Sequence, residues 1–330
     1  MIRVGVIGLG TMGYSHAKIY EKIPFVEVAG VCDSNEEALN KVGKEFGANM
    51  YTDYRELLSN PDIDAVSICM PDDLHVDPVL AAVEYGKHIL LEKPIANTVE
   101  NGKRILEAVT GYDRVFTVGY NMRYDVRYSK IRENVKNGMI GDIVHISSRR
   151  NSGIGGPLRF IGHTDLSMHV MVHDINIINW FMDCSPQRVF AKKRDLVLKE
   201  HNMTDTILAI ITYGDGTIVC MEACWIMNPN WPYAVDDYLE VVGTRGVVYT
   251  DGCGQGFRMS TEDTNTYPDT RYRPVLNGCY AGDLGEELMG FINSIIKKDP
   301  PMTTAREAMK DLRVVDAIQR SIASGKEELV

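Results

Sequence analysis

Short apolar runs alternate with amphipathic stretches along the first third of the chain. The apolar runs cover residues 2–7, 26–32, 65–69, 88–91 and 115–118. Short runs of this kind are typical of strands buried on both faces, and the stretches between them have the three- and four-residue spacing of helices. Glycines at 47 and 86 end two of these helices. The alternation predicts right-handed parallel βαβ units.

The pattern changes after about residue 125. A helix is predicted over 126–137, and strands are predicted over 142–150, 188–196, 205–213, 216–225 and 238–243. Consecutive strands without helices between them favour an antiparallel sheet. We therefore predict an α/β domain over residues 1–122 and an α+β domain over 123–330. The last amphipathic stretch, 302–324, is expected to form a helix that packs back on the first domain.

Charge and composition narrow the classes of partner. The net charge is −10, which disfavours binding to nucleic acid. No apolar run approaches the ~20 residues of a membrane span, and no signal peptide precedes the first strand. The seven cysteines are scattered without a CxxC pair, as in a cytoplasmic protein with reduced thiols. We expect a cytoplasmic protein without nucleic-acid or membrane partners.

A glycine-rich loop follows the first strand. Its sequence is Gly8-Leu9-Gly10-Thr11-Met12-Gly13. Gly8 allows a tight turn, Gly10 lets the backbone approach a diphosphate, and Gly13 allows close helix–strand packing. The N–H groups at Thr11 and Met12 open the next helix and face an anion. The context predicts a dinucleotide site, because the loop follows a strand and opens a helix.

The residue after the second strand selects between the two nicotinamide cofactors. Asp33 lies twenty residues beyond Gly13, where a carboxylate accepts hydrogen bonds from ribose hydroxyls and repels a 2′-phosphate. Ser34 and Asn35 supply no cation. The predicted cofactor is therefore NAD rather than NADP.

Glu92-Lys93-Pro94 follows the apolar run 88–91. This position is the carboxyl end of a parallel strand, where ligands of doubly wound sheets bind. Lys93 could reach both the nicotinamide ribose and a substrate hydroxyl, and the Lys–Pro bond could be cis. Taken alone, the tripeptide fits a surface salt bridge better than a catalytic site.

Together these motifs resemble the Gfo/Idh/MocA oxidoreductase family. The matching segments are the glycine loop, Asp33, Met70-Pro71-Asp72 with His75, Glu92-Lys93-Pro94, residues 118–124 and residues 138–141. The resemblance implies an N-terminal Rossmann domain, a doubly wound parallel sheet, followed by a C-terminal α+β domain with an open, mostly antiparallel sheet. It implies that Lys93 binds substrate beside the nicotinamide. It also implies that Met70, Pro71, His75 and Glu92 belong to the cofactor site.

A histidine-containing stretch supplies the second catalytic candidate. Asp165, His169 and His173 are spaced four apart and would share one face of a helix. Family members commonly carry an Asp four residues before a His. His173 matches that His, which makes it the proton-transfer residue, but His169 stands where the Asp is expected and Asp165 lies one turn too early. Asp165 and His169 remain substrate-binding candidates.

The chemistry of alcohol oxidation fits these residues. A histidine accepts a proton reversibly near neutral pH, and a lysine favours a developing alkoxide. We therefore assign Lys93 and His173 as catalytic residues. Two alternatives stay open at the histidines: a core helix with hydrogen-bonded imidazoles, and a metal site, for which the i, i+4 spacing is acceptable. We predict no metal.

Arg123 and Tyr124 are further substrate-binding candidates. Arg123 could hold a carboxylate or phosphate with two parallel hydrogen bonds, and its alternative is an interdomain salt bridge.

The resulting expectation is an NAD-dependent dehydrogenase that acts on a secondary hydroxyl of a sugar, cyclitol or nucleotide sugar. Alternatives are an oxidoreductase that recycles tightly bound NAD and a non-catalytic NAD-binding regulator. An open sheet needs cover for its outer face, so a homodimer or homotetramer is expected.

Overall fold

The computed structural model describes residues 1–159, 161–228, 230–263 and 265–330. The chain forms two compact units. The first unit comprises residues 1–121 and 272–309, and the second comprises residues 122–271 and 310–330.

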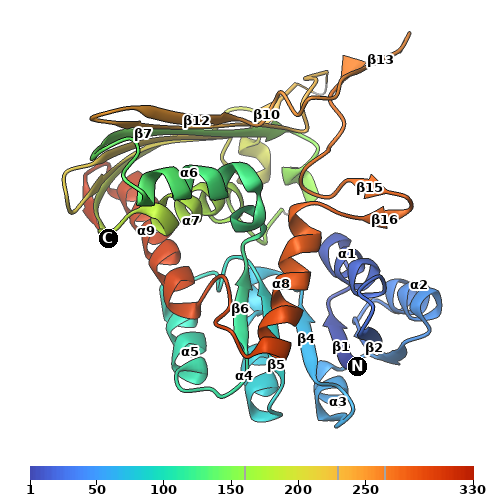
Figure 1. The fold of residues 1–330 in the computed structure, drawn as a ribbon. Coiled ribbons are helices and arrows are strands. Elements are labelled where there is room, and N and C mark those ends of the chain that lie inside the picture. The colour runs from blue at the N-terminus through green and yellow to red at the C-terminus, as the bar shows by residue number, and fades with distance from the viewer. Residues whose placement is uncertain (160, 229, 264) are drawn as a thin grey trace. The chain divides into compact units, whose positions relative to one another are not determined.

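The first unit is built on a six-stranded parallel sheet with the strand order β3-β2-β1-β4-β5-β6 (Figure 1). Its strands are β1 Ile2–Ile7, β2 Val26–Cys32, β3 Asn49–Tyr51, β4 Ala65–Ile68, β5 His88–Glu92 and β6 Phe116–Gly119. Its helices are α1 Thr11–Tyr20, α2 Glu36–Phe46, α3 Tyr54–Ser59, α4 Val76–Glu84, α5 Val99–Val109 and α8 Asp283–Lys297. This strand order confirms the predicted Rossmann sheet.

Helices cover both faces of this sheet. Helices α1, α2 and α8 share a buried core with one face, in which Val4, Val6 and Val28 pack with Leu288 and Phe291. On the other face, α4 contacts both α3 and α5. The strands are apolar throughout because both of their faces are buried.

Helix α8 changes the predicted division of the chain. The sequence placed residues 123–330 together, but α8 and the preceding hairpin of β15 Val275–Leu276 and β16 Cys279–Tyr280 belong to the first unit. The cause is the apolar face of α8, which completes the core against α1. Helix α9, Ala305–Ser324, begins in the first unit and ends in the second.

The second unit contains a seven-stranded sheet in the order β12-β11-β7-β10-β9-β8-β17. Its strands are β7 Ile143–Gly153, β8 Pro186–Arg194, β9 Thr206–Tyr213, β10 Ile218–Met227, β11 Val235–Gly243, β12 Val247–Asp251 and β17 Glu328–Leu329. Within this sheet, β7–β10 is the one parallel pair among the described residues. The expected mostly antiparallel sheet is confirmed. One face packs on α6 Val126–Lys136 and α7 Val172–Phe181, and the short strands β13 Met259–Ser260 and β14 Asn265–Thr266 form a separate hairpin.

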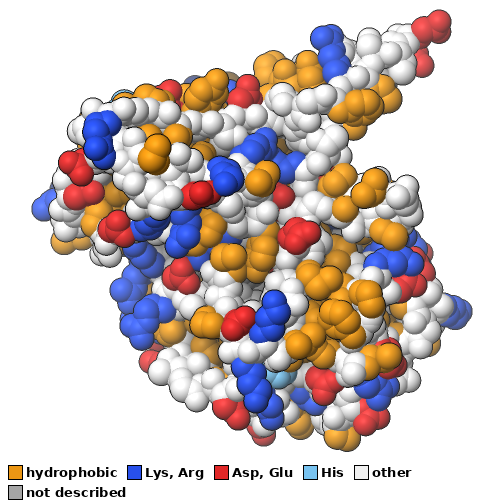
Figure 2. All heavy atoms as spheres, viewed as in Figure 1, with side chains coloured by type: hydrophobic (Ala, Val, Ile, Leu, Met, Phe, Trp, Pro, Cys, Tyr) orange, Lys and Arg blue, Asp and Glu red, His pale blue; other side chains and the backbone are white. Residues whose placement is uncertain are grey.

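Charged side chains of both signs are interspersed on the surface drawn in Figure 2. The net charge of −10 is therefore not gathered into one acidic patch on that face. Among the described residues, no helix combines the length and apolar character of a membrane span.

Candidate active site

The glycine loop has the geometry that a bound diphosphate requires. Gly8 has a positive φ of 86°, and a Cβ there would lie 2.7 Å from the carbonyl oxygen of Cys69. A Cβ on Gly13 would overlap the carbonyl oxygen of Gly8, so only glycine allows α1 to start this close to β1. Gly10 precedes α1 and no described side chain caps the helix. The backbone N–H groups of Thr11 and Met12, in the first turn of α1, are therefore available to bind an anion.

Asp33 fixes the loop from the end of β2. Its Oδ2 accepts a hydrogen bond from the backbone N–H of Leu9 at 2.6 Å, and its Oδ1 accepts one from Asn35 at 2.8 Å. A carboxylate has about four lone-pair sites, so these bonds leave acceptor capacity for ribose hydroxyls. Asp33 therefore holds the glycine loop in place, and its remaining acceptor sites fit the ribose hydroxyls of the predicted NAD.

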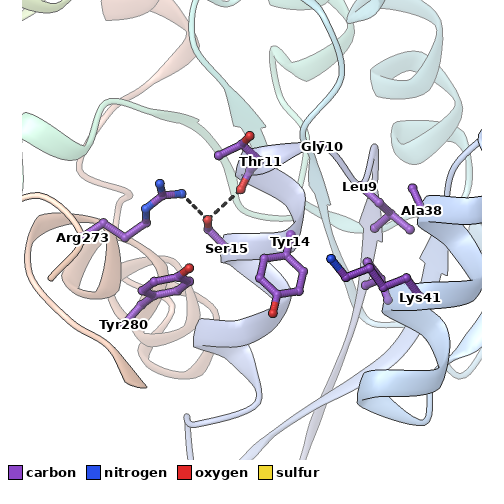
Figure 3. A pocket seen from close by; sticks show the side chains of 10 residues that line it. Leu9, Gly10, Thr11, Tyr14, Ser15, Ala38, Lys41, Arg273 and Tyr280 are labelled. Atoms are coloured by element: carbon purple, nitrogen blue, oxygen red, sulfur yellow. Dashed lines mark hydrogen bonds between the residues drawn. The ribbon is translucent and has the colours of Figure 1, made fainter. Parts of the chain in front are cut away.

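A pocket of about 390 Å³ lies against the glycine loop (Figure 3). Its wall includes Leu9, Gly10 and Thr11, and two cations, Lys41 on α2 and Arg273 just before the β15–β16 hairpin. Arg273 donates a hydrogen bond to Ser15 Oγ on α1 at 2.5 Å. Neither cation was predicted from the sequence. No local motif marks Lys41, and none links Arg273 to a loop at the start of the chain.

Lys93 stands at the carboxyl edge of the same sheet, directly after β5. The Lys93–Pro94 peptide bond is cis. His75 connects the two neighbouring edge loops: its Nδ1 lies 3.0 Å from the carbonyl oxygen of Pro94, and its Nε2 lies 2.9 Å from that of Met70. His75 is fully buried, and burial lowers its pKa. The imidazole therefore supports the loops of Met70, Pro71 and Lys93 rather than lining an open surface.

His173 belongs to the second unit, at the start of α7. The predicted regular helix from Asp165 to Trp180 is interrupted, because Ser167–Met171 forms a π-helical turn that precedes α7. The longer turn breaks the common face expected for Asp165, His169 and His173. His169 and His173 are both half-buried, and the ring of His169 lies 6.3 Å from that of Trp225.

Asp165 holds the start of this segment together. Its Oδ1 accepts hydrogen bonds from the backbone N–H groups of Ser167 at 2.7 Å and Met168 at 3.1 Å. Its Oδ2 accepts one from the side chain of Gln319 on α9 at 2.6 Å. These contacts are those of a helix cap, and they explain why the turn begins at Asp165.

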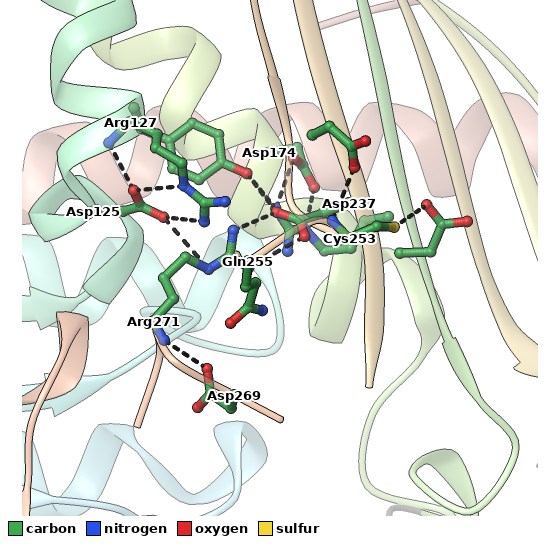
Figure 4. A network of polar contacts seen from close by, with 12 residues as sticks. Asp125, Arg127, Asp174, Asp237, Cys253, Gln255, Asp269 and Arg271 are labelled. Carbon is green, nitrogen blue, oxygen red and sulfur yellow. Dashed lines mark hydrogen bonds and ion pairs between the residues drawn. The ribbon is translucent and has the colours of Figure 1, made fainter. Parts of the chain in front are cut away.

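A buried network of charges connects α7 to the seven-stranded sheet (Figure 4). Arg150 on β7 donates two hydrogen bonds to Asp174, at 2.6 and 3.1 Å, and one to Tyr128 on α6 at 3.1 Å. Tyr128 in turn donates to Asp237 on β11 at 3.0 Å, and Arg271 donates to the same carboxylate at 2.9 Å. Burial raises the pKa of Tyr128 and of Asp237. Because Asp174 follows His173, the network fixes the backbone that carries the histidine.

Arg123 is buried within the second unit. Its Nε donates to Asn176 Oδ1 at 2.9 Å, and its guanidinium stacks 5.4 Å from the ring centre of Trp180. Asn176 donates onward to Asp311 at 2.6 Å. This placement favours a structural part for Arg123 in holding α7 and α9 together. Tyr124 beside it is half-buried.

Both halves of the chain match the models of one protein family. Residues 2–120 match the model of an oxidoreductase family with an NAD-binding Rossmann fold, and residues 132–329 match its C-terminal α/β domain. The chain belongs to the Gfo/Idh/MocA oxidoreductase family. The glycine loop, the uncapped start of α1 and Asp33 fit the NAD of this family. The predictions of the family, of NAD as the cofactor and of an NAD-dependent dehydrogenase are confirmed.

Curated relatives and solved structures agree with this membership. The myo-inositol 2-dehydrogenase of Thermotoga maritima is 26% identical, covering 97% of this chain and 96% of its own. An inositol 2-dehydrogenase of Pseudomonas savastanoi is 31% identical over 74% of this chain and 73% of its own. The scyllo-inositol dehydrogenase of Lactobacillus casei, solved with NAD(H) and scyllo-inositol, shares the fold with a TM-score of 0.86, 22% identity and coverage of 100% and 99%.

Proposed function

We propose that this protein oxidises a secondary hydroxyl of a cyclitol or a related sugar and passes the hydride to NAD. The observation that carries the proposal is the position of Lys93, directly after the sheet edge that also holds the glycine loop and Asp33. The names of the curated relatives, which are inositol dehydrogenases, support a cyclitol as the substrate class.

The proposed reaction assigns separate parts to the cofactor, Lys93 and His173. When bound, NAD supplies the acceptor for a hydride. The ammonium of Lys93 orients the substrate oxygen and stabilises the developing alkoxide. His173 accepts the hydroxyl proton on its imidazole, so one C–H and one O–H bond break as the ketone forms. In the reverse direction His173 returns the proton.

Other candidate residues take supporting parts in this proposal. His169 and Tyr124 are half-buried and remain the candidates for contact with the substrate. Asp165 and Arg123 already serve as a helix cap and a buried link, so we assign them to positioning the histidines. Arg273 and Lys41 add positive charge beside the expected diphosphate.

The test is NADH formation from NAD with panels of cyclitols, free sugars and nucleotide sugars. Lys93→Met and His173→Gln are each expected to lower kcat by about 10²- to 10⁴-fold, the usual contribution of such groups. The exposed residues Lys103 and His201 supply matched controls, Lys103→Met and His201→Gln, which should leave turnover unchanged. Absence of turnover on all panels despite NADH binding, or full activity of either catalytic-site variant, would refute the proposal.

We also propose that the protein works as a homo-oligomer. The outer face of the seven-stranded sheet exposes Phe190, Leu208, Ile210, Ile218 and Tyr249. An exposed apolar sheet face of this kind is a typical protein-binding surface.

A cytoplasmic location stays a prediction. It is supported by the seven cysteines, all of which are free thiols.

A further inference from the structure

Three ionisable side chains from distant parts of the chain meet inside the first unit. They are His16 on α1, Glu92 at the end of β5 and Glu287 on α8. Their exposed fractions are 0%, 7% and 3%, and one nitrogen or oxygen atom of each lies within 4.8 Å of those of the other two. None of the three has a part in the proton and hydride transfers proposed above.

The two carboxyl groups differ in their partners. Glu92 lies 3.2 Å from His16 Nε2 and accepts a hydrogen bond from the backbone N–H of Lys93 at 3.2 Å. Neither oxygen of Glu287 accepts a hydrogen bond from the described residues. Both groups face Gly119, where a Cβ would lie 3.5 Å from Glu92 Oε1 and 3.6 Å from Glu287 Oε2. One oxygen of Glu287 therefore lies within 4.8 Å of an oxygen of Glu92.

This arrangement is unfavourable if both groups are ionised. A buried carboxylate without a donor loses its hydration without replacement, and two adjacent carboxylates disfavour a second negative charge. Burial, together with Glu92 and Asp283, raises the pKa of Glu287 well above its usual value. Burial opposes ionisation of Glu92 too, but His16 and Lys93 outweigh it and lower that pKa. The remaining groups around the cluster, Tyr20 and Cys69, are neutral acids whose pKa values are raised by burial.

We propose that Glu287 is a protonated carboxylic acid at neutral pH that donates its proton in a hydrogen bond to Glu92. The pair then carries one negative charge instead of two. Because Glu92 immediately precedes Lys93, Glu287 acts as a positioning residue for the turn that presents this lysine. The effect on Lys93 rests on the proposed function, whereas the protonation of Glu287 does not.

The proposal fixes the sign of a pH dependence. An acid whose pKa is raised by folding binds more protons in the folded state than in the unfolded state. Its contribution to stability is complete below the unfolded pKa of about 4.3 and is lost as the pH rises towards the folded pKa. Gln in place of Glu287 keeps an N–H donor for Glu92 but cannot ionise, so it removes this loss.

The first experiment compares thermal unfolding of the full-length protein between about pH 5 and pH 9. Glu287→Gln should gain Tm relative to the wild type as the pH rises. Glu286→Gln, an exposed neighbour on the same helix, should run parallel to the wild type. A Glu287→Gln curve that runs parallel to the wild type, or falls below it at high pH, contradicts the proposal.

A second measurement does not depend on a variant that folds. Infrared difference spectra of the wild type with isotope-labelled glutamate should show a protonated carboxyl band at neutral pH, and its absence overturns the proposal. Elemental analysis of protein purified without a histidine tag provides a further check. A stoichiometric divalent cation would mean that His16, Glu92 and Glu287 ligate a metal instead.

The positioning role has its own readout. In the wild type, kcat should fall on the alkaline side as Glu287 ionises, and Glu287→Gln should move that fall to higher pH with little change in KM for NAD. An unchanged pH profile contradicts the positioning role. If the protein shows no turnover at all, the proposed function fails, and the Tm and infrared results still decide the protonation.

Discussion

Two glycines of the loop after β1 have different surroundings, although the motif contains both. A Cβ on Gly13 would overlap the backbone of Gly8, whereas a Cβ on Gly10 would meet nothing within 4 Å. Gly10 also has a φ of −64°, which any residue adopts. Gly13 is therefore required by the fold, and Gly10 is required only by the approach of a diphosphate.

This difference predicts opposite phenotypes for two alanine variants. Gly13→Ala should lose about 1–3 kcal/mol or more of unfolding free energy, the usual cost of overpacking. Gly10→Ala should keep the stability of the wild type but raise the Kd for NADH about tenfold or more, equivalent to ~1.4 kcal/mol. Urea unfolding and fluorescence titration measure the two quantities. Equal losses of stability in both variants would contradict this division.

The same contrast shows which residues a sequence can reveal. Gly8, Asp33 and Lys93 lie within short segments whose strand–loop–helix context is local, so their positions were predictable. Arg273 and Glu287 belong to the first unit although they lie far from its other residues in the sequence. No local pattern marks either residue. Charge and spacing cannot show which distant side chains a fold brings together.

Helix α7 illustrates the same limit for a whole element. Its apolar spacing predicted a helix, and residues 172–181 form one. The π-helical turn before it was not predictable, because it depends on the hydrogen bonds of Asp165 with Ser167 and with Gln319 on α9. The resulting shift decides where His169 lies relative to His173.

The buried pair of Arg150 and Asp174 fixes α7 to the sheet, which predicts a non-additive response. Arg150→Met and Asp174→Leu should each cost about 3–5 kcal/mol, because each leaves one buried charge without its partner. The double variant should cost less than the sum, because both charges are gone. Urea unfolding gives the three values, and Arg188→Met, at an exposed arginine of β8, is the control. Strict additivity would show that the two residues do not act as a pair.

At the scale of the whole molecule, the two fold classes were predictable and the division between them was not. Alternating and consecutive strands have distinct patterns, so both sheets were expected. The helix at 283–297 was not identified, and an amphipathic helix does not reveal which core its apolar face joins. Its packing with α1 and the strands of the first unit is a property of the folded chain.

The outer face of the second sheet leads to the last prediction. Ile210 on β9 lies opposite Phe190 on β8 and Cys220 on β10, and Leu208 projects on the same side two residues away. Their exposed fractions, 48% for Ile210 and 54% for Leu208, mean that a lysine at either position costs the isolated subunit little. At the centre of a subunit interface, two lysines would lose hydration and repel their copies across a two-fold axis.

The double variant Leu208→Lys with Ile210→Lys should therefore reduce the mass measured by light scattering, while its circular dichroism spectrum stays that of the folded protein. Val126→Lys, at a residue of α6 that is 68% exposed, should leave the mass unchanged. A wild-type monomer, or a double variant that keeps the oligomeric mass, would show that this sheet face is not the subunit interface.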